Sequence, residues 1–116
     1  MHRVDEYCTN IGIIFFLNSI NFITEQFDII YSSLTFMHFG NKWEAIKKIY
    51  RCLAQNGICV LSLDKNQNSI LEYGTRQVKV YPDDPEEIMN IFLKCGFCEI
   101  ERYEIDLAYL IRAKRK

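Results

Sequence analysis

The sequence lacks an excess of charge of either sign, and it is poor in the residues that separate domains. Its 116 residues hold 14 basic and 15 acidic side chains, so the net charge is −1. Without a strong positive field the chain has no electrostatic means of collecting a polyanion, so we expect no nucleic-acid partner. Only five glycines and two prolines occur, and no linker or repeat divides the chain. This length, with 49% hydrophobic residues, predicts one domain around one core.

Apolar runs long enough to cross a bilayer are missing as well. The run Ile11 to Leu17 is too short, and Asn18 and Ser19 interrupt its continuation. The first residues carry Asp5 and Glu6 and precede no small-residue cleavage site, unlike a signal peptide. We therefore expect a soluble cytoplasmic protein with no membrane partner.

Cysteine occurs in an odd number, which argues for reduced thiols in a reducing compartment. The five are Cys8, Cys52, Cys59, Cys95 and Cys98. Cys95 and Cys98 form a C-x-x-C motif, which is compatible with a redox pair or half of a zinc site. A zinc site needs a second pair, and a redox pair normally opens a helix, whereas this one closes it. The sequence therefore predicts no metal site.

Two short apolar segments predict buried strands of a parallel sheet. Phe27 to Ser32 has Asp28 as its only charge, and Ile58 to Leu63 has none. Both are too apolar for a strand with one solvated face. The run Ile11 to Leu17 has the same character and predicts another strand, whereas residues 1–10 show no period and are expected to fray.

A helix is expected between the two strands, which makes a parallel βαβ unit. Asn41 is its predicted cap, with Glu44 three residues later as in a capping box, and Asn56-Gly57 is expected to end it. The predicted buried stripe is Trp43, Ile46, Ile49, Tyr50 and Leu53. The predicted solvated face is Lys42, Glu44, Lys47, Lys48 and Arg51.

The rest of the chain predicts a second helix and a terminal hairpin. Asp84 is the expected cap of the helix, Pro85 its first residue and Gly96 its stop. The runs Phe97 to Glu104 and Leu107 to Ala113 are separated by only a couple of residues, so they must form an antiparallel pair.

Three segments carry a family resemblance: FDIIYSSLTFMHF, KWEAIKKIYRCLAQNGICVLSLD and YPDDPEEIMNIFLKCGF. In this order they resemble the C-terminal half of a class I S-adenosylmethionine-dependent methyltransferase, over residues 10–116. SSLTFMH with LSLDKNQ resembles, more narrowly, a small-molecule methyltransferase branch of low-GC Gram-positive bacteria. The resemblance implies an α/β fold in one partial domain over residues 1–116. This is a truncated Rossmann-like methyltransferase sheet with parallel strands and a C-terminal antiparallel hairpin, lacking its first two strands.

The resemblance also implies the cofactor S-adenosylmethionine, with weak or absent binding by this chain. The family holds the cofactor with a glycine-rich turn and a ribose-binding acid, and this sequence contains no G-x-G. Asn18, followed by Ser19, stands where the family usually has an aspartate that accepts from the adenine amine. An asparagine carbonyl still accepts that bond, without the charge that strengthens it.

The segment after the first parallel strand supplies the remaining cofactor and catalytic candidates. The resemblance places Ser32, Ser33 and Leu34 near the transferred methyl group, although they could equally turn the chain into the next loop. His38 is the catalytic candidate, because a histidine side chain can act as a general base near neutral pH. We favour a packed or backbone-bonded His38, because methyl transfer depends chiefly on alignment.

Substrate contacts are expected from Asp64, which follows the second strand, and from Tyr73 and Arg76, in the polar stretch that would shape a substrate lid. Val78 to Tyr81 is expected to form a short strand or an extended lid. Asp64 could instead cap a turn, and loop aromatics often cover a core edge. Trp43, Tyr50 and Phe92 have helical spacing and are expected in the core.

The expected activity is methyl transfer to a small-molecule acceptor. Two alternatives stay open: a non-catalytic remnant that acts as an interaction or dimerisation module, and one half of a split methyltransferase. A nucleotide-binding oxidoreductase fits the terminal hairpin less well. The apolar edge at 27–32 invites pairing with Ile11 to Leu17, with a second copy as a homodimer, or with a missing N-terminal half.

Overall fold

The computed structural model describes residues 27–34 and 36–116, apart from the side chain of Tyr73. The predictions for residues 1–10, for the strand Ile11 to Leu17 and for Asn18 and Ser19 lie outside these described residues.

Four strands form one mixed sheet in the order β1-β2-β6-β5. β1 (Phe27–Ser33) runs parallel to β2 (Leu53–Asp64). β6 (Ala108–Arg115) pairs antiparallel with β2 on one side and with β5 (Phe97–Glu104) on the other. The predicted parallel pair and the predicted antiparallel hairpin are both confirmed.

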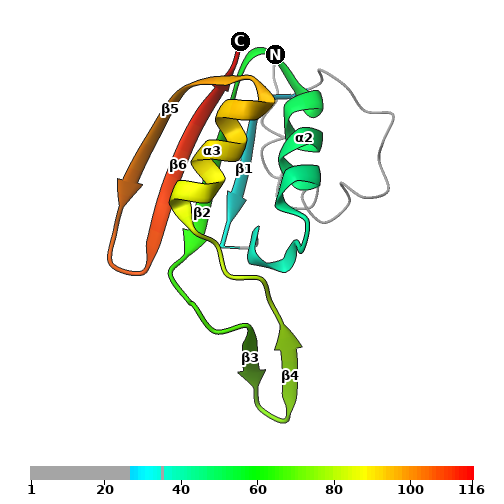
Figure 1. The fold of residues 1–116 in the computed structure, drawn as a ribbon, viewed down its shortest axis with the longest axis vertical. Coiled ribbons are helices and arrows are strands. Elements are labelled where there is room, and N and C mark those ends of the chain that lie inside the picture. Colours follow the sequence, from blue (N-terminus) through cyan, green and yellow to red (C-terminus); the bar gives the residue numbers. More distant parts are fainter. Residues whose placement is uncertain (1–26, 35) are drawn as a thin grey trace.

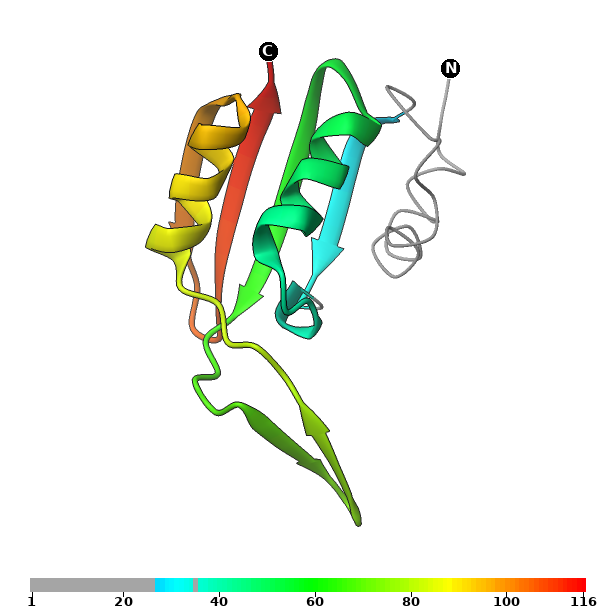
Figure 2. The same cartoon turned by 45° about the vertical axis from the view of Figure 1, so that its right-hand side comes forward.

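Two helices cover one face of this sheet and lie side by side on it (Figures 1 and 2). α2 (Lys42–Cys52) connects β1 to β2, and α3 (Pro85–Cys95) precedes β5. The predicted helix ends are confirmed for α3 and for the start of α2. Asn41 Oδ1 accepts from the Glu44 N–H at 3.0 Å, and Asp84 Oδ1 accepts from the Glu86 N–H at 3.1 Å. Gly96 ends α3 with a φ of 107°, a conformation that glycine adopts without strain.

The core lies between the helices and the sheet. α2 contributes Ile46 and Ile49, and α3 contributes Ile88 and Phe92, all fully buried. Phe97 of β5 contacts both helices. Its ring packs edge-on against the rings of Phe92 on α3 and Tyr50 on α2, with centroid distances of 4.7 Å and 5.0 Å. The sheet side of the core is made by Ile30, Leu61, Leu63 and Ile111.

A small hairpin extends away from this body, beyond the ends of β1 and β2 (Figure 1). It consists of β3 (Ile70–Tyr73) and β4 (Arg76–Lys79), paired antiparallel. The extended segment expected at Val78 to Tyr81 is therefore part of a two-stranded hairpin, with its strand placed two residues earlier. Between β1 and α2 lies a single 3-10 turn, η1 (Phe36–His38).

The end of α2 differs from the sequence prediction. The helix stops at Cys52, and Leu53 is already extended, with φ −77° and ψ 138°. The left-handed turn expected at Asn56-Gly57 is present at Asn56, which has a φ of 66°, but it forms an irregularity within β2. A Cβ on Gly57 would lie 2.8 Å from the Ala54 carbonyl oxygen, so the chain folds back tightly there and glycine is required.

The two faces of α2 are also rotated from the prediction. Lys42, expected in solvent, is buried, and Trp43, expected in the core, is 40% exposed. The buried positions on α2 are Lys42, Ala45, Ile46, Ile49 and Cys52. This stripe has helical periodicity, and Trp43 falls at its margin. Tyr50 is half-buried, also at the margin, and only Phe92 of the three aromatic residues predicted in the core is fully buried.

β1 is buried on one face rather than on both, whereas β2 is buried on both faces at its carboxyl end, from Leu61 to Leu63. In β1, Ile30 and Ser32 are fully buried, whereas Ile29 and Tyr31 are 37% and 39% exposed. Within the described part of the chain, both helices cover the same face of the sheet (Figure 2). The apolar composition of β1 therefore exceeds what this packing alone requires.

Phe92→Ala tests the position of the core. Removing a fully buried ring that contacts Phe97 should lower the free energy of unfolding by about 3–5 kcal/mol. Leu93→Ala, one residue further on α3 at a position that is 63% exposed, is the matched control and should cost less than about 1 kcal/mol. Urea unfolding of both variants measures the difference, and equal losses would contradict the packing of α3.

Candidate active site at the carboxyl end of the parallel strands

The parallel pairing brings the carboxyl ends of β1 and β2 together. Ser32 lies opposite Leu61 and Ser33 opposite Ser62. The chain leaves β1 through Leu34, whose N–H donates to the Ser62 carbonyl oxygen at 2.9 Å. Ligand sites of open α/β sheets occur at the carboxyl edge of the parallel strands. Ser32, Ser33 and Leu34 lie at this edge, which is where the sequence predicts them.

Leu34 has a strained backbone. Its φ of 56° lies in the left-handed region, which leucine rarely adopts, and its side chain is 40% exposed. Neighbouring Ser32 is fully buried, and Ser33 is half-buried. Strain of this kind is retained where the surroundings enforce it, and it is concentrated at functional sites.

The end of β2 is organised as a turn by Asp64. Its Oδ1 accepts from the Asn66 N–H at 2.7 Å, and Asn66 Oδ1 accepts in turn from the Asn68 N–H at 3.2 Å. Lys65 forms an ion pair with Glu104 at 2.7 Å, between Nζ and Oε2. The structural alternative for Asp64, a turn cap, is thus the role that its hydrogen bond shows.

Lys42 connects the loop after β1 to the base of the hairpin. Its Nζ donates to the carbonyl oxygens of Phe36 and Tyr81, both at 2.9 Å, and lies 2.8 Å from Asp83 Oδ1. The Tyr81 N–H donates to the Met37 carbonyl oxygen at 2.7 Å, and the Val80 N–H donates to that of Ser69 at 2.8 Å. An isolated two-stranded hairpin is marginally stable, so these bonds determine where the hairpin lies relative to the strand ends.

The Lys42–Asp83 ion pair is buried. The Asp83 side chain is fully buried and the Lys42 side chain is 9% exposed. Beyond this pair, neither Asp83 oxygen accepts a hydrogen bond from the described residues. Burial raises the pKa of Asp83 and lowers the pKa of Lys42, and in each case the partner's charge opposes the shift. Each charge depends on the other to remain stable in this position.

His38 and the hairpin residues lie apart from this pair. His38 is exposed at the end of η1, and its side chain has no hydrogen bond to another described residue. The expectation of a packed His38 is therefore wrong, and the expected backbone hydrogen bond is not made with the described residues. Tyr73 pairs with Arg76 next to the turn at Gly74, at the end of the hairpin farther from the sheet. The structure thus brings Ser33, Leu34 and Asp64 to one edge and leaves Arg76 away from it.

Sequence reasoning missed Lys42 and Asp83. The sequence pattern predicts Lys42 on the solvated face of α2, whereas the buried stripe of the helix includes it. A signal was present at Asp83, because it precedes Asp84, and only one of two successive aspartates is needed to cap α3. A second aspartate that does not cap the helix needs a cation when it is buried, and Lys42 is that cation.

Two other classes of site find no support in the described residues. No group of histidine, cysteine or acidic side chains between residues 27 and 116 could hold a metal ion. Cys95 and Cys98 are free thiols, and burial raises the pKa of Cys95, although Lys47 opposes the shift. A raised pKa disfavours the thiolate that a redox cysteine needs.

In the same part of the chain, neither helix has the length and apolar character of a membrane span.

Comparisons with known proteins find a partial match to one family model. A family model described as a methyltransferase domain matches residues 13–61, which include β1, η1, α2 and most of β2. No curated protein matches the sequence significantly.

Several solved structures that share this fold are described as methyltransferases. A proposed S-adenosylmethionine-dependent methyltransferase from Listeria monocytogenes has a TM-score of 0.73 at 15% identity, covering 86% of this chain and 66% of its own. An S-adenosylmethionine-dependent methyltransferase from Mesorhizobium loti has a TM-score of 0.67 at 14% identity, covering 85% of this chain and 66% of its own. Phosphoethanolamine N-methyltransferase 2 from Haemonchus contortus, in complex with S-adenosyl-L-methionine, has a TM-score of 0.64 at 14% identity, covering 82% of this chain and 34% of its own. The chain spans less than two thirds of each of these proteins.

Lys42→Met tests the buried ion pair. The change leaves the Asp83 carboxylate buried without its cation, so the free energy of unfolding should fall by about 3–5 kcal/mol. Lys65→Met is the matched control, because it breaks an exposed pair and should cost less than about 1 kcal/mol. Adding Asp83→Leu to Lys42→Met should recover part of the loss.

Urea unfolding gives the energies, and amide exchange of Tyr81 reports whether the hairpin has detached. Equal costs for Lys42→Met and Lys65→Met would contradict the role of the buried pair.

Proposed function

We propose that this chain forms the methyl-acceptor side of an S-adenosylmethionine-dependent methyltransferase active site and that the acceptor is a small molecule. The proposal rests on the strained backbone of Leu34. Leu34 lies at the carboxyl end of the parallel pair, in a left-handed conformation, and its N–H forms a hydrogen bond to the Ser62 carbonyl oxygen. The methyltransferase-domain match to residues 13–61 and the methyltransferases that share the fold support it.

The chemistry at this edge is mainly alignment. The cofactor, when bound, supplies a methyl group on a sulfonium, and transfer requires the acceptor to lie in line with that bond. The half-buried Ser33 offers a hydroxyl for orientation, and the exposed Leu34 offers an apolar contact beside it. His38, exposed two residues before Gly40, is available to accept a proton where the acceptor must lose one.

The described residues could form only part of a binding site for the cofactor. They provide the edge of β1 and β2, but no G-x-G occurs in the sequence to approach the methionine end of the cofactor. We place the adenine contact at Asn18 and Ser19, outside the described residues. Cofactor binding by this chain alone should therefore be weaker than micromolar, and a tighter site requires further elements, from a partner subunit or a separate N-terminal half.

A second candidate is an interaction module without catalysis. Tyr31 on β1 is 39% exposed, and β1 has one strand neighbour within the described residues. An edge strand of this composition favours pairing with another chain. A homodimer or a complex with an N-terminal half would use the surface at 27–32.

Titration of the isotope-labelled protein with S-adenosylhomocysteine tests the proposal. At millimolar ligand we expect amide shifts at Ser32 to Leu34 and at Asp64, with an affinity weaker than micromolar. Leu34→Gly relieves the strained backbone, so it should change stability by less than about 1 kcal/mol while reducing these shifts.

Two outcomes would contradict parts of this proposal. Absence of shifts at the strand ends would favour the interaction module, above all if the protein sediments as a dimer. Micromolar affinity for the chain alone would show that the cofactor site is more complete than we propose.

A further inference from the structure

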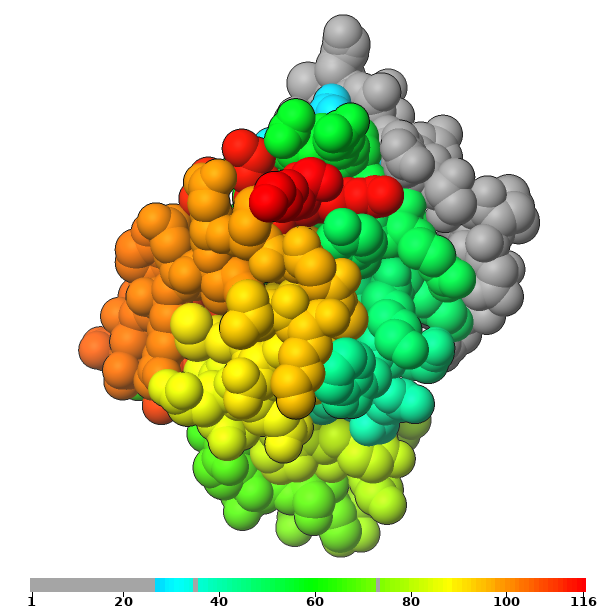
Figure 3. Space-filling model, turned by 45° about the horizontal axis from the view of Figure 1, so that its top comes forward, coloured from blue at the N-terminus to red at the C-terminus, as the bar shows by residue number. Residues whose placement is uncertain are grey.

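A groove between the outer surfaces of α2 and α3 has a composition unlike that of the strand ends. It has a volume of about 350 Å³. Its lining residues are Trp43, Lys47, Tyr50, Arg51, Lys94 and Cys95. Three of the six are cations, two are aromatic, and none is acidic. Figure 3 shows the surfaces of the two helices meeting along this side of the molecule.

The cations of this groove have no carboxylate partner among residues 27–34 and 36–116. Lys47, Arg51 and Lys94 make no ion pair or hydrogen bond with a side chain of the described residues. Five other cations have carboxylate partners: Lys42 with Asp83, Lys65 with Glu104, Arg102 with Glu86, Arg112 with Glu101 and Lys114 with Glu99. Three positive charges close together, with no partner among the described residues, would attract an anion.

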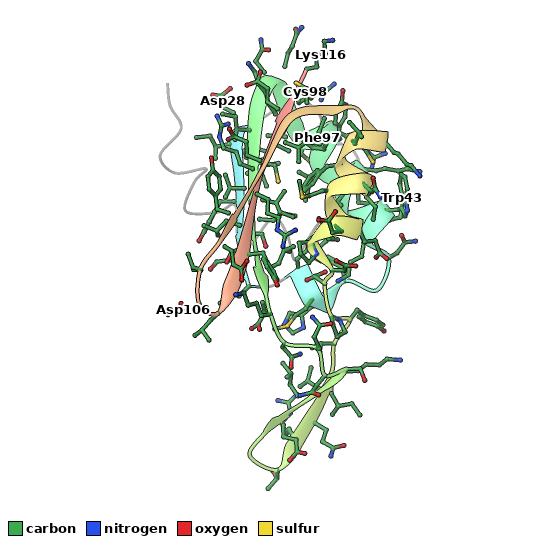
Figure 4. All side chains as sticks on the ribbon, turned by 60° about the vertical axis from the view of Figure 1, so that its left-hand side comes forward. Asp28, Trp43, Phe97, Cys98, Asp106 and Lys116 are labelled. Atoms are coloured by element: carbon green, nitrogen blue, oxygen red, sulfur yellow. The ribbon has the colours of Figure 1, made fainter. Side chains whose placement is uncertain are left out.

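Trp43 adds an aromatic surface to the same groove. Its side chain is 40% exposed and lies on the outer side of the helix layer, away from the sheet (Figure 4). Tyr50, half-buried, forms the floor of the groove toward the core, where its ring contacts Phe97. An indole next to unpaired cations suits a ligand that carries both an aromatic ring and a negative charge.

We propose that this groove binds a nucleoside phosphate, with the base stacked on Trp43 and the phosphate between Arg51 and Lys94. Lys47 lies on α2 between Trp43 and Arg51, where the sugar and phosphate would pass. The volume is that of a small-ligand pocket, since such pockets range from about 300 to 1,000 Å³. The planar guanidinium of Arg51 matches two phosphate oxygens at once.

The orientation follows from the next hollow along the helices. It shares Trp43 and is lined also by Gly40, Asn41, Lys42, Glu87 and Ile91. The Glu87 carboxylate would repel a phosphate there, so the phosphate should lie at the Arg51 and Lys94 end. The groove lies on the outside of the helix layer, and its occupancy does not depend on the cofactor site proposed at the carboxyl ends of β1 and β2.

The intrinsic fluorescence of Trp43 provides the test, because it is the only tryptophan in the chain. The probes are adenosine monophosphate, adenosine and inorganic phosphate, each titrated into the full chain. We expect saturable quenching by adenosine monophosphate that weakens with salt, and at least tenfold weaker binding of adenosine or phosphate alone. Arg51→Ala with Lys94→Ala should weaken adenosine monophosphate binding about tenfold or more.

Lys79→Ala removes a cation on β4 outside the groove and is the matched control, which should leave the titration unchanged. Circular dichroism verifies that each variant is folded. No saturable quenching, or equal binding by the double variant, would overturn the proposal. Phosphate as tight as the nucleotide would overturn the stacking on Trp43, and adenosine as tight would overturn the role of the three cations.

Discussion

The parallel hydrogen bonding of β1 to β2 is the constraint on which the rest of the structure depends. Parallel strands cannot be joined by a tight turn, so the chain must cross the sheet between them, and α2 makes that crossing. The crossing buries Ile46 and Ile49 against the sheet. It also brings the carboxyl ends of both strands to one edge, where Leu34 is bonded to Ser62.

The hairpin β3–β4 depends on a different interaction, the buried contact of Lys42 with Asp83. Lys42 starts the crossover helix, and Asp83 immediately precedes the cap of α3. One ion pair therefore joins the two helix starts, and the bonds of the Lys42 ammonium to Phe36 and Tyr81 extend this connection to η1 and to the base of the hairpin. The segments that surround the proposed methyl-transfer edge are therefore held together by a buried ion pair.

Sequence reasoning succeeded where a local rule decides the structure. The caps Asn41 and Asp84 and the stop at Gly96 form because backbone groups at helix ends need partners that these residues supply nearby. The antiparallel β5–β6 pair follows from the short connection alone. The edge carrying Ser32, Ser33 and Leu34 was predictable because it needs only two parallel strands.

The predictions for α2 were wrong where contacts with residues distant in the sequence determine the structure. Burial of Lys42 requires Asp83, which lies on another element, and no helical period of α2 reveals it. Trp43 is exposed because the buried stripe of α2 is centred on Ile46 and Ile49. The prediction assigned Trp43 to this stripe because it is large and aromatic. The early end of α2 at Cys52 reflects the pairing of Leu53 with Phe27, a contact between elements.

The most direct measurement is the backbone register of β1 against β2, from nuclear Overhauser contacts in the isotope-labelled protein. We expect backbone contacts of Ile30 with Cys59, Tyr31 with Val60 and Ser33 with Ser62, advancing in the same direction along both strands. Contacts that advance in opposite directions, or none between these strands, would remove the common edge on which the methyltransferase proposal rests.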